Sequence, residues 1–335
     1  MTEMQHSEFG RDPYSSLSIE TLKVPARLSV LAGIVPENGG PCAAVRKGLT
    51  ILQFGETLKL HAPAVIFDID DTLIKGSGEH LHDGPNGRFA RALVMLLEAY
   101  GRKFNLADWP NYRALTGKTE SLVCQDICRL ASREYGGNLD PVVYRSLARQ
   151  IVLDDPESFT ASLRPVDGVK ALLNNLKAAG SSLVTCSCGD HLVMNAVMRQ
   201  FKLKHLFEWV RGSADKRTST GFSGATVAEV AHYMKRACRS CVMVGDSMSD
   251  VGAATRAGLP LVVVRLPDWS EAAVQKFQAD YEMFKARYPR AAARTSVVLI
   301  QDYGQISAVA TCSLPVPFVE SAVSAQPPGA ERQAA

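Results

Sequence analysis

The sequence predicts an α/β protein in which helices cover both faces of a parallel sheet and a separate helical domain is inserted. From residue 64 onward, short apolar runs that end in small or acidic residues alternate with segments of helical periodicity. Residues 81–164, in contrast, show helical periodicity alone. Strands that alternate with helices pair in parallel, and the connecting helices then cover the faces of the sheet.

Five apolar runs are the expected strands. They are AVIFD, SLVTCS, FEWVRGS, CVMVGDS and PLVVVRL, beginning at residues 64, 182, 207, 241 and 260. Helices are expected between them, and the best example lies within residues 164–180. There Val169, Leu172, Leu173 and Leu176 fall on one face, and Gly180 ends the helix. The order of elements is that of a Rossmann-like sheet.

The inserted segment is expected to form a cap. One helix carries a stripe of Phe89, Leu93, Leu96, Leu97 and Tyr100, and a second carries Leu122, Ile127, Leu130 and Ala131. A third begins with Asp140 as its cap and Pro141 at its first position. Ligands of open parallel sheets bind beyond the carboxyl ends of the strands. An insertion after the first strand therefore lies over the site.

These patterns predict four regions. Residues 1–60 are an N-terminal extension that ends in a short strand, LTILQF, and residues 61–80 with 165–312 form the α/β core. Residues 81–164 are the cap, and residues 313–335 have the composition of a disordered tail. Within the core, residues 266–292 are expected to add one or two helices, and TSVVLIQDYGQI an edge strand.

The composition is that of a soluble globular protein, with 46% hydrophobic and 21% charged residues in a chain of 335. The formal net charge of +3 is small and its charges are interspersed, which argues against nucleic acid or an anionic membrane as a partner. We recognise no signal peptide and no apolar run long enough to span a bilayer. A cytoplasmic location is expected, in which the eight cysteines stay reduced.

Acidic residues follow two of the expected strands. VIFDIDDTLI supplies Asp68 and Asp70, and VMVGDSMSD supplies Asp246 and Asp250. Because parallel strands end at one edge of a sheet, these four carboxylates are expected to converge. Such a cluster requires a hard divalent cation, and Mg²⁺ is the usual one where a substrate brings phosphate oxygens.

The motifs DIDDT, LVTCS, a later basic residue and GDSMSD, in this order, resemble the four motifs of the haloacid dehalogenase superfamily. The resemblance covers residues 64–265, and the cap position is similar to that of the C1-capped branch, which includes phosphoglycolate phosphatase and β-phosphoglucomutase. It implies a Mg²⁺-dependent phosphatase that hydrolyses a small phosphorylated metabolite through an aspartyl-phosphate intermediate.

The resemblance also implies roles for the acidic residues. Asp68 is the expected nucleophile, and Asp70 the acid and base that protonates the leaving oxygen and later deprotonates water. The metal is expected to bind the carboxylates of Asp68 and Asp246 and the main-chain carbonyl of Asp70. Asp250 either contacts the metal indirectly or orients the basic residue. Dehalogenases of the family lack the second aspartate, so Asp70 favours phosphoryl chemistry.

Two further roles remain open between neighbours. Thr185 is the expected hydroxyl that binds the phosphoryl oxygens, and Ser187 is the alternative because the register of the strand is uncertain. Lys216 is the expected cation beside the nucleophile, with Arg217 as the alternative.

The cap offers candidates for substrate choice. The segment LTGKTES supplies Gly117 and Lys118, which in a C1-capped protein face the active site and bind the substrate. A plain turn between helices is an equally good interpretation. His80 and His82 lie in a glycine-rich loop and are expected to be solvated.

Two other functions fit part of this pattern. A sugar phosphomutase uses the same core residues but transfers the phosphoryl group to a sugar hydroxyl. A non-catalytic protein could use the fold as a binding platform, but the complete acidic set argues against it.

Overall fold

A computed structural model describes residues 30–36, 43–77, 81–82, 84–113, 120–218 and 221–309. Its centre is a seven-stranded sheet in which every neighbouring pair of strands is parallel, as predicted. In spatial order the strands are β3 (Gly48–Ile51), β14 (Ser296–Ile300), β13 (Leu261–Arg265), β12 (Cys241–Gly245), β5 (Ala64–Phe67), β8 (Ser182–Cys186) and β9 (Trp209–Arg211).

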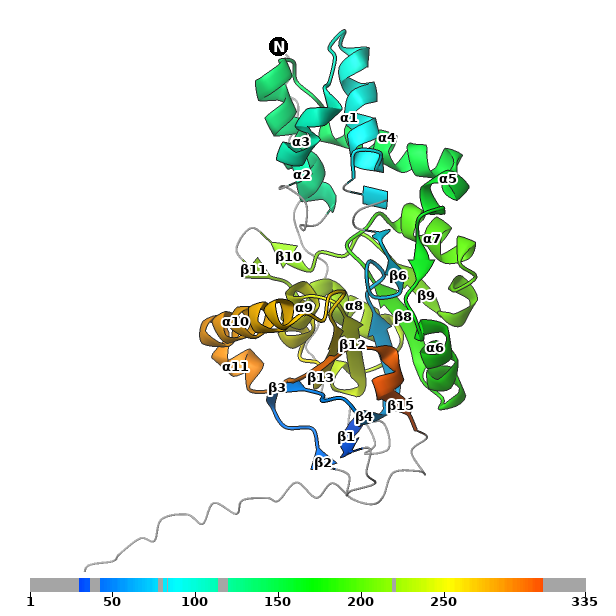
Figure 1. Cartoon of the computed structure of the whole chain (residues 1–335), viewed down its shortest axis with the longest axis vertical. Coiled ribbons are helices and arrows are strands. Elements are labelled where there is room, and N and C mark those ends of the chain that lie inside the picture. Colours follow the sequence, from blue (N-terminus) through cyan, green and yellow to red (C-terminus); the bar gives the residue numbers. More distant parts are fainter. Residues whose placement is uncertain are drawn as a thin grey trace, which may run out of the picture.

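Helices pack on both faces of this sheet (Figure 1). On one face lie α6 (Val169–Ala178) and α7 (His191–Gln200), and on the other α8 (Ala225–Tyr233), α9 (Met248–Ala257) and α10 (Glu271–Arg287), which α11 (Pro289–Ala292) follows. Successive side chains of β5 alternate between the two cores, with Val65 and Phe67 on the α6 side and Ala64 and Ile66 on the α8 side. The predicted apolar face of α6 is buried in full.

A second, four-stranded sheet lies at the end of the molecule opposite the cap (Figure 1). Its strands are β1 (Leu31–Pro36), β2 (Ala43–Ala44), β4 (Glu56–His61) and β15 (Ile306–Ala308). The predicted strand near residue 50 is β3, which forms the edge of the central sheet. The segment TSVVLIQDYGQI was expected at that edge, but β14 is internal and buried along its whole length because β3 covers it.

The cap contains α1 (Arg88–Ala99), α2 (Trp109–Arg113) after the 3₁₀ turn η3 (Leu106–Asp108), α3 (Glu120–Tyr135), α4 (Pro141–Asp154) and α5 (Pro156–Thr160). The Asp140 carboxylate caps α4 as predicted, accepting from the amide of Val142. Tyr100 lies beyond the end of α1 and is exposed. The buried face of α3 also differs from prediction. Cys124 and Cys128 lie on this face, where buried thiols pack as small apolar groups. Leu122 and Leu130, which were expected there, are partly exposed.

Two short strands connect the cap to the core. β6 (Ile74–Lys75) leaves the core and β7 (Arg164–Pro165) returns to it, and the two pair in antiparallel fashion. The remaining short elements are η4 (Lys204–Leu206), β10 (Arg217–Thr218), β11 (Gly221–Phe222), η5 (Cys238–Ser240) and η6 (Tyr303–Gln305). Among the described residues, every helix is too short or too polar to cross a bilayer.

Candidate active site

Asp68 lies directly beyond β5, at the carboxyl edge of the central sheet. The adjacent strand β12 ends at Gly245, so Asp246 follows at the same edge, and the Asp68 amide donates to the carbonyl of Val244 (2.9 Å). The Asp68 side chain is buried, and that of Asp246 is partly exposed. The convergence predicted from two parallel strands is therefore present, because the strands are in register up to this edge.

Lys216 lies between two of the carboxylates. Its buried ammonium is 2.8 Å from Asp68 Oδ1 and 2.7 Å from Asp250 Oδ1. Burial opposes protonation of this lysine, but Asp250 and Asp68 raise its pKa well above the ordinary value. Arg217, the alternative, is exposed and instead donates to the hydroxyl of Ser249 on α9 (3.0 Å). The geometry thus selects Lys216.

The carboxylate of Asp250 accepts hydrogen bonds from three residues. Oδ1 accepts from Lys216, and Oδ2 accepts from the amides of Asp246 and Ser247 (both 3.2 Å) and from the Ser247 hydroxyl (3.1 Å). Gly245 makes room for this carboxylate, because a Cβ there would lie 2.3 Å from Asp250 Cγ. Of the two roles open to Asp250, this arrangement favours orienting Lys216.

These groups form a cluster that we call the acidic edge: Asp68, Asp70, Asp246, Asp250 and Lys216. Carboxylate oxygens of Asp68, Asp246 and Asp250 lie within 4.8 Å of one another. Burial raises the pKa of Asp246 well above its ordinary value, and Asp250 and Asp68 add to this. Burial also raises the pKa of Asp68, which reaches about 7 although Lys216 opposes the shift.

A divalent cation fits the acidic edge. The carboxylates of Asp68, Asp246 and Asp250 cluster around the ammonium of Lys216, and burial together with their mutual repulsion raises the pKa values of Asp68 and Asp246. The donors are all oxygens, which hard cations such as Mg²⁺ prefer. Asp68 and Asp246 have oxygens suited to a metal, whereas both oxygens of Asp250 already accept hydrogen bonds.

Asp70 contacts a different set of residues. Its Oδ1 is 3.4 Å from His82 Nε2, and its Oδ2 accepts from the Ser187 hydroxyl at 3.3 Å. Burial raises the pKa of Asp70, but the contact with His82, together with Ser77 and Arg88, brings it down to about 2. Arg88 Nε donates to His82 Nδ1 (2.8 Å), so the Nε2 of the same ring carries the hydrogen that faces Asp70.

Two expectations from the sequence, for Thr185 and His82, differ from the structure. Thr185 is fully buried and its hydroxyl donates to the carbonyl of Arg211 on β9, because it pairs with Phe67 inside the sheet, before the edge is reached. Ser187, the alternative, lies beyond the strand, and its hydroxyl donates to Asp70 Oδ2. His82 was expected to be solvated, but it is buried between Asp70 and Arg88.

Gly117 and Lys118, the candidates for substrate choice, lie outside the described residues, as does His80.

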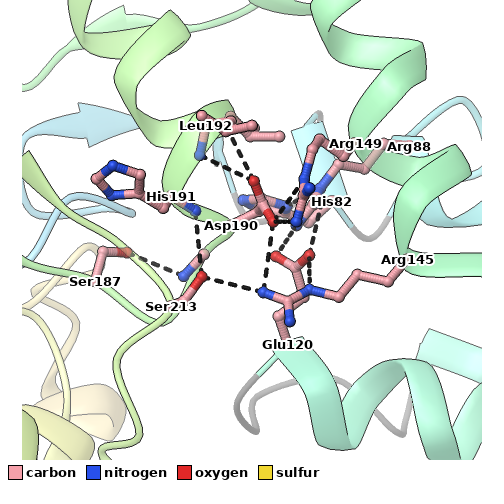
Figure 2. Close-up of polar contacts among 12 residues, drawn as sticks. His82, Arg88, Glu120, Arg145, Arg149, Ser187, Asp190, His191, Leu192 and Ser213 are labelled. Carbon is pink, nitrogen blue, oxygen red and sulfur yellow. Dashed lines mark hydrogen bonds and ion pairs between the residues drawn. The ribbon is translucent and has the colours of Figure 1, made fainter. Parts of the chain in front are cut away.

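A second cluster of charges joins the cap to the core (Figure 2), and its member His82 contacts Asp70. We call His82, Arg88, Glu120, Arg145, Arg149 and Asp190 the cap–core network. Arg88 of α1 is almost fully buried and binds both carboxylate oxygens of Glu120, at the start of α3 (2.6 and 3.2 Å). This pair fixes two cap helices to each other directly above His82.

The network reaches the core through α4. Arg149 donates twice to Asp190 Oδ2 (2.7 and 3.0 Å), and Arg145 contacts Glu120, Asp190 and the hydroxyl of Ser213 (3.1 Å). Asp190 also caps α7, accepting from the amide of Leu192 with its other oxygen. The Asp190 carboxylate therefore binds the cap helix α4 with one oxygen and caps the core helix α7 with the other, as Figure 2 shows.

Sequence reasoning missed every arginine and carboxylate of this network. Arg88, Arg145 and Arg149 lie on amphipathic helices, where charged residues are usually solvated. Asp190 carried the one usable signal, because it stands directly before a helical segment and after a candidate motif.

Comparison with known proteins identifies the family of this chain. A family model described as haloacid dehalogenase-like hydrolase matches residues 62–258, more than half of the chain. A phosphoglycolate phosphatase of Caulobacter vibrioides is 33% identical over 116 residues, which are 35% of this chain and 48% of the relative. The match thus spans about half of that relative's length.

Solved structures with a similar arrangement include a predicted phosphoglycolate phosphatase from Haemophilus somnus, with 20% identity, a TM-score of 0.45, and coverage of 61% of this chain and 84% of that one. A putative β-phosphoglucomutase from Thermotoga maritima has 15% identity, a TM-score of 0.43, and coverage of 70% and 93%.

Proposed function

Because this chain belongs to the haloacid dehalogenase-like hydrolases, we propose that it is a Mg²⁺-dependent phosphatase of a small phosphorylated metabolite. The single observation that carries the proposal is the placement of Asp68. This buried carboxylate stands at the carboxyl edge of the sheet, beside Lys216 and next to a carboxylate with a second set of partners, Asp70. A nucleophile and an acid–base group two residues apart suit phosphoryl transfer to a carboxylate.

In the first step, a carboxylate oxygen of Asp68 attacks the phosphorus of the substrate, and the bond between phosphorus and the ester oxygen breaks. Asp70 gives a proton to the departing oxygen. The low pKa of Asp70 means that it is ionised in the free protein. A phosphate dianion beside it raises that pKa, which favours uptake of the proton that Asp70 donates.

In the second step, Asp70, now ionised again, takes a proton from a water molecule. The water oxygen attacks the phosphorus of the aspartyl-phosphate, and the Asp68 carboxylate leaves with its original charge. His82 and Ser187 hold the two oxygens of Asp70, which limits its rotation between the two steps. Ser187 is also the hydroxyl proposed to bind a phosphoryl oxygen, in place of Thr185.

Mg²⁺ is proposed to bind the carboxylates of Asp68 and Asp246 and the main-chain carbonyl of Asp70, and when bound it neutralises charge on the phosphoryl oxygens. Lys216 neutralises Asp68 from the other side, and Asp250 orients Lys216.

The cap is proposed to exclude bulk water and to favour compact substrates. In this structure the cap–core network closes α4 onto α7 beside the acidic edge. A closed cap prevents water from competing for charged groups during transfer. Gly117 and Lys118 remain the proposed residues for substrate choice.

The test is phosphate release from a panel of sugar, nucleoside and organic-acid phosphates, each with Mg²⁺ or with EDTA. We expect release that requires Mg²⁺ and that disappears in Asp68→Asn, which keeps the size of the side chain. Turnover retained in that variant contradicts the assignment of the nucleophile. Isomerisation of a sugar phosphate without net phosphate release contradicts hydrolysis and indicates a mutase.

A further inference from the structure

The turn that follows the nucleophile strand is held from outside the catalytic motifs. Asp71 adopts a left-handed conformation (φ 52°), which is unfavourable for a residue with a side chain. Within the turn, the Asp71 amide donates to the carbonyl of Ile74 and the Leu73 amide to that of Ile69 (both 2.8 Å). These bonds close the turn but leave the carbonyls of Asp71 and Thr72 for other donors.

Two buried side chains bind those carbonyls. Arg265 Nη2 donates to the carbonyl of Asp71 (2.8 Å), and the Tyr303 hydroxyl donates to that of Thr72 (2.7 Å). The Arg265 guanidinium also lies over the Tyr303 ring, 5.8 Å from its centre. Arg265 and Tyr303 therefore hydrogen-bond to the carbonyls of two consecutive residues directly after Asp70.

Both residues come from the C-terminal part of the chain, beyond residue 258 where the family model ends. Arg265 is the last residue of β13. Tyr303 begins η6, and Asp302 caps that turn by accepting from the amide of Gly304 (2.7 Å). The position of the Tyr303 hydroxyl is thus fixed by its own local structure.

We infer that Tyr303, with Arg265, is a positioning residue for the reaction. Rotating the peptide groups of Asp71 or Thr72 displaces the Asp70 main chain on one side. On the other side it displaces the Thr72 hydroxyl, which lies 3.5 Å from Asp246 Oδ1. Tyr303 therefore acts through the turn on both the acid–base group and a proposed metal ligand. The inference rests on the proposed function.

The experiment compares Tyr303→Phe with a matched control, Tyr281→Phe. Tyr281 is equally buried, but it belongs to α10 on the opposite face of the sheet, and its hydroxyl has no hydrogen-bond partner among the described residues. For each variant we would measure kcat and KM with p-nitrophenyl phosphate. The Mg²⁺ concentration that gives half of the maximal thermal stabilisation would be measured without substrate.

For Tyr303→Phe we expect kcat to fall roughly tenfold with KM nearly unchanged, because a small displacement of a catalytic group costs rate rather than binding. We also expect a several-fold higher Mg²⁺ midpoint. Tyr281→Phe is expected to change neither quantity. Arg265→Lys keeps the charge but not the two-pronged set of donors. It is expected to change kcat and the Mg²⁺ midpoint in the same direction as Tyr303→Phe, and it supplies a second test if Tyr303→Phe folds poorly.

The outcomes separate the two proposals. A wild-type protein that neither releases phosphate nor responds to Mg²⁺ overturns the proposed function, and the inference with it. An active, Mg²⁺-responsive wild type in which Tyr303→Phe and Arg265→Lys behave like Tyr281→Phe overturns the inference alone.

Discussion

The acidic edge and the cap–core network lie side by side yet balance their charges in opposite ways. In the acidic edge, Asp68 and Asp250 share the ammonium of Lys216, and the nearby carboxylate of Asp246 adds a further negative charge. In the cap–core network, three guanidinium groups face the carboxylates of Glu120 and Asp190, and each carboxylate accepts from two of them. The first cluster is therefore short of positive charge, whereas the carboxylates of the second are paired with arginines of the chain.

The same residue type shows the difference directly. Burial raises the pKa of Asp68 to about 7, and Lys216 does not offset it. Burial acts on Asp190 too, but hydrogen bonds and charge from Arg149 lower its pKa below the ordinary value. A buried aspartate that is short of positive charge suits metal binding and chemistry, and one that is fully paired suits structure.

The largest effect is expected from removing the shared cation. Lys216→Met leaves buried carboxylates without a partner, which typically costs about 3–5 kcal/mol. We expect this loss of unfolding free energy at pH 7 in EDTA, measured by urea denaturation. Arg217→Met is the matched control, since Arg217 is itself exposed, and a loss of about 0.5 kcal/mol or less is expected. Equal losses in the two variants would show that the acidic edge is not short of cations.

A pH dependence should follow from Asp68. Its pKa is about 7 in the folded protein against an ordinary 3.8, so the folded state keeps a proton that the unfolded chain releases. Stability without metal is therefore expected to fall as the pH rises from about 4 to about 7, by at most about 4 kcal/mol from this group. Urea denaturation in EDTA at several pH values tests this. In Asp68→Asn the unfolding free energy should fall less steeply with pH. An unchanged slope would show that Asp68 is not the group responsible for the pH dependence.

Metal should reverse the shortage of positive charge. At a Mg²⁺ concentration about 100 times its dissociation constant, stabilisation of about 3 kcal/mol is expected. Asp246→Asn should abolish this response and yet make the metal-free protein more stable, because it removes one repelling charge. Thermal melts with and without Mg²⁺ measure both quantities. Asp155→Asn, at the exposed start of α5, should leave the Mg²⁺ response unchanged.

The smallest effect is expected in the cap–core network. Asp190→Asn keeps an oxygen for capping α7 but removes the charge that binds Arg149, so a loss of about 1–2 kcal/mol is expected, reduced because Arg149 is partly exposed. Asp140→Asn is the control, a cap with the same local bond at an exposed position. Mg²⁺ should stabilise both variants as it does the wild type. A change of that response in Asp190→Asn alone would mean that the two clusters are coupled.

The sequence predicted the parallel sheet and the meeting of Asp68, Asp246 and Lys216, because apolar runs and strand ends are local signals. It left the site hydroxyl open between Thr185 and Ser187, since only the pairing of Thr185 with Phe67 shows where β8 leaves the sheet. The cap–core network depends on how α1, α3 and α4 dock, and no local pattern in a helix distinguishes a buried arginine from a solvated one. Tyr303 was likewise invisible, because its partner Thr72 is distant in the chain.

The pairing of β4 with β15 has a consequence for biosynthesis. Lys59 and Ser307 contact each other across 248 positions of the chain. At translation rates of about 5–20 residues per second, roughly 12–50 s pass between the synthesis of the two strands. During that time β3 and β4 have no partner from β14 or β15, and exposed strand edges invite aggregation. Residues 48–61 are therefore the segment that stays longest without these two strand partners during synthesis.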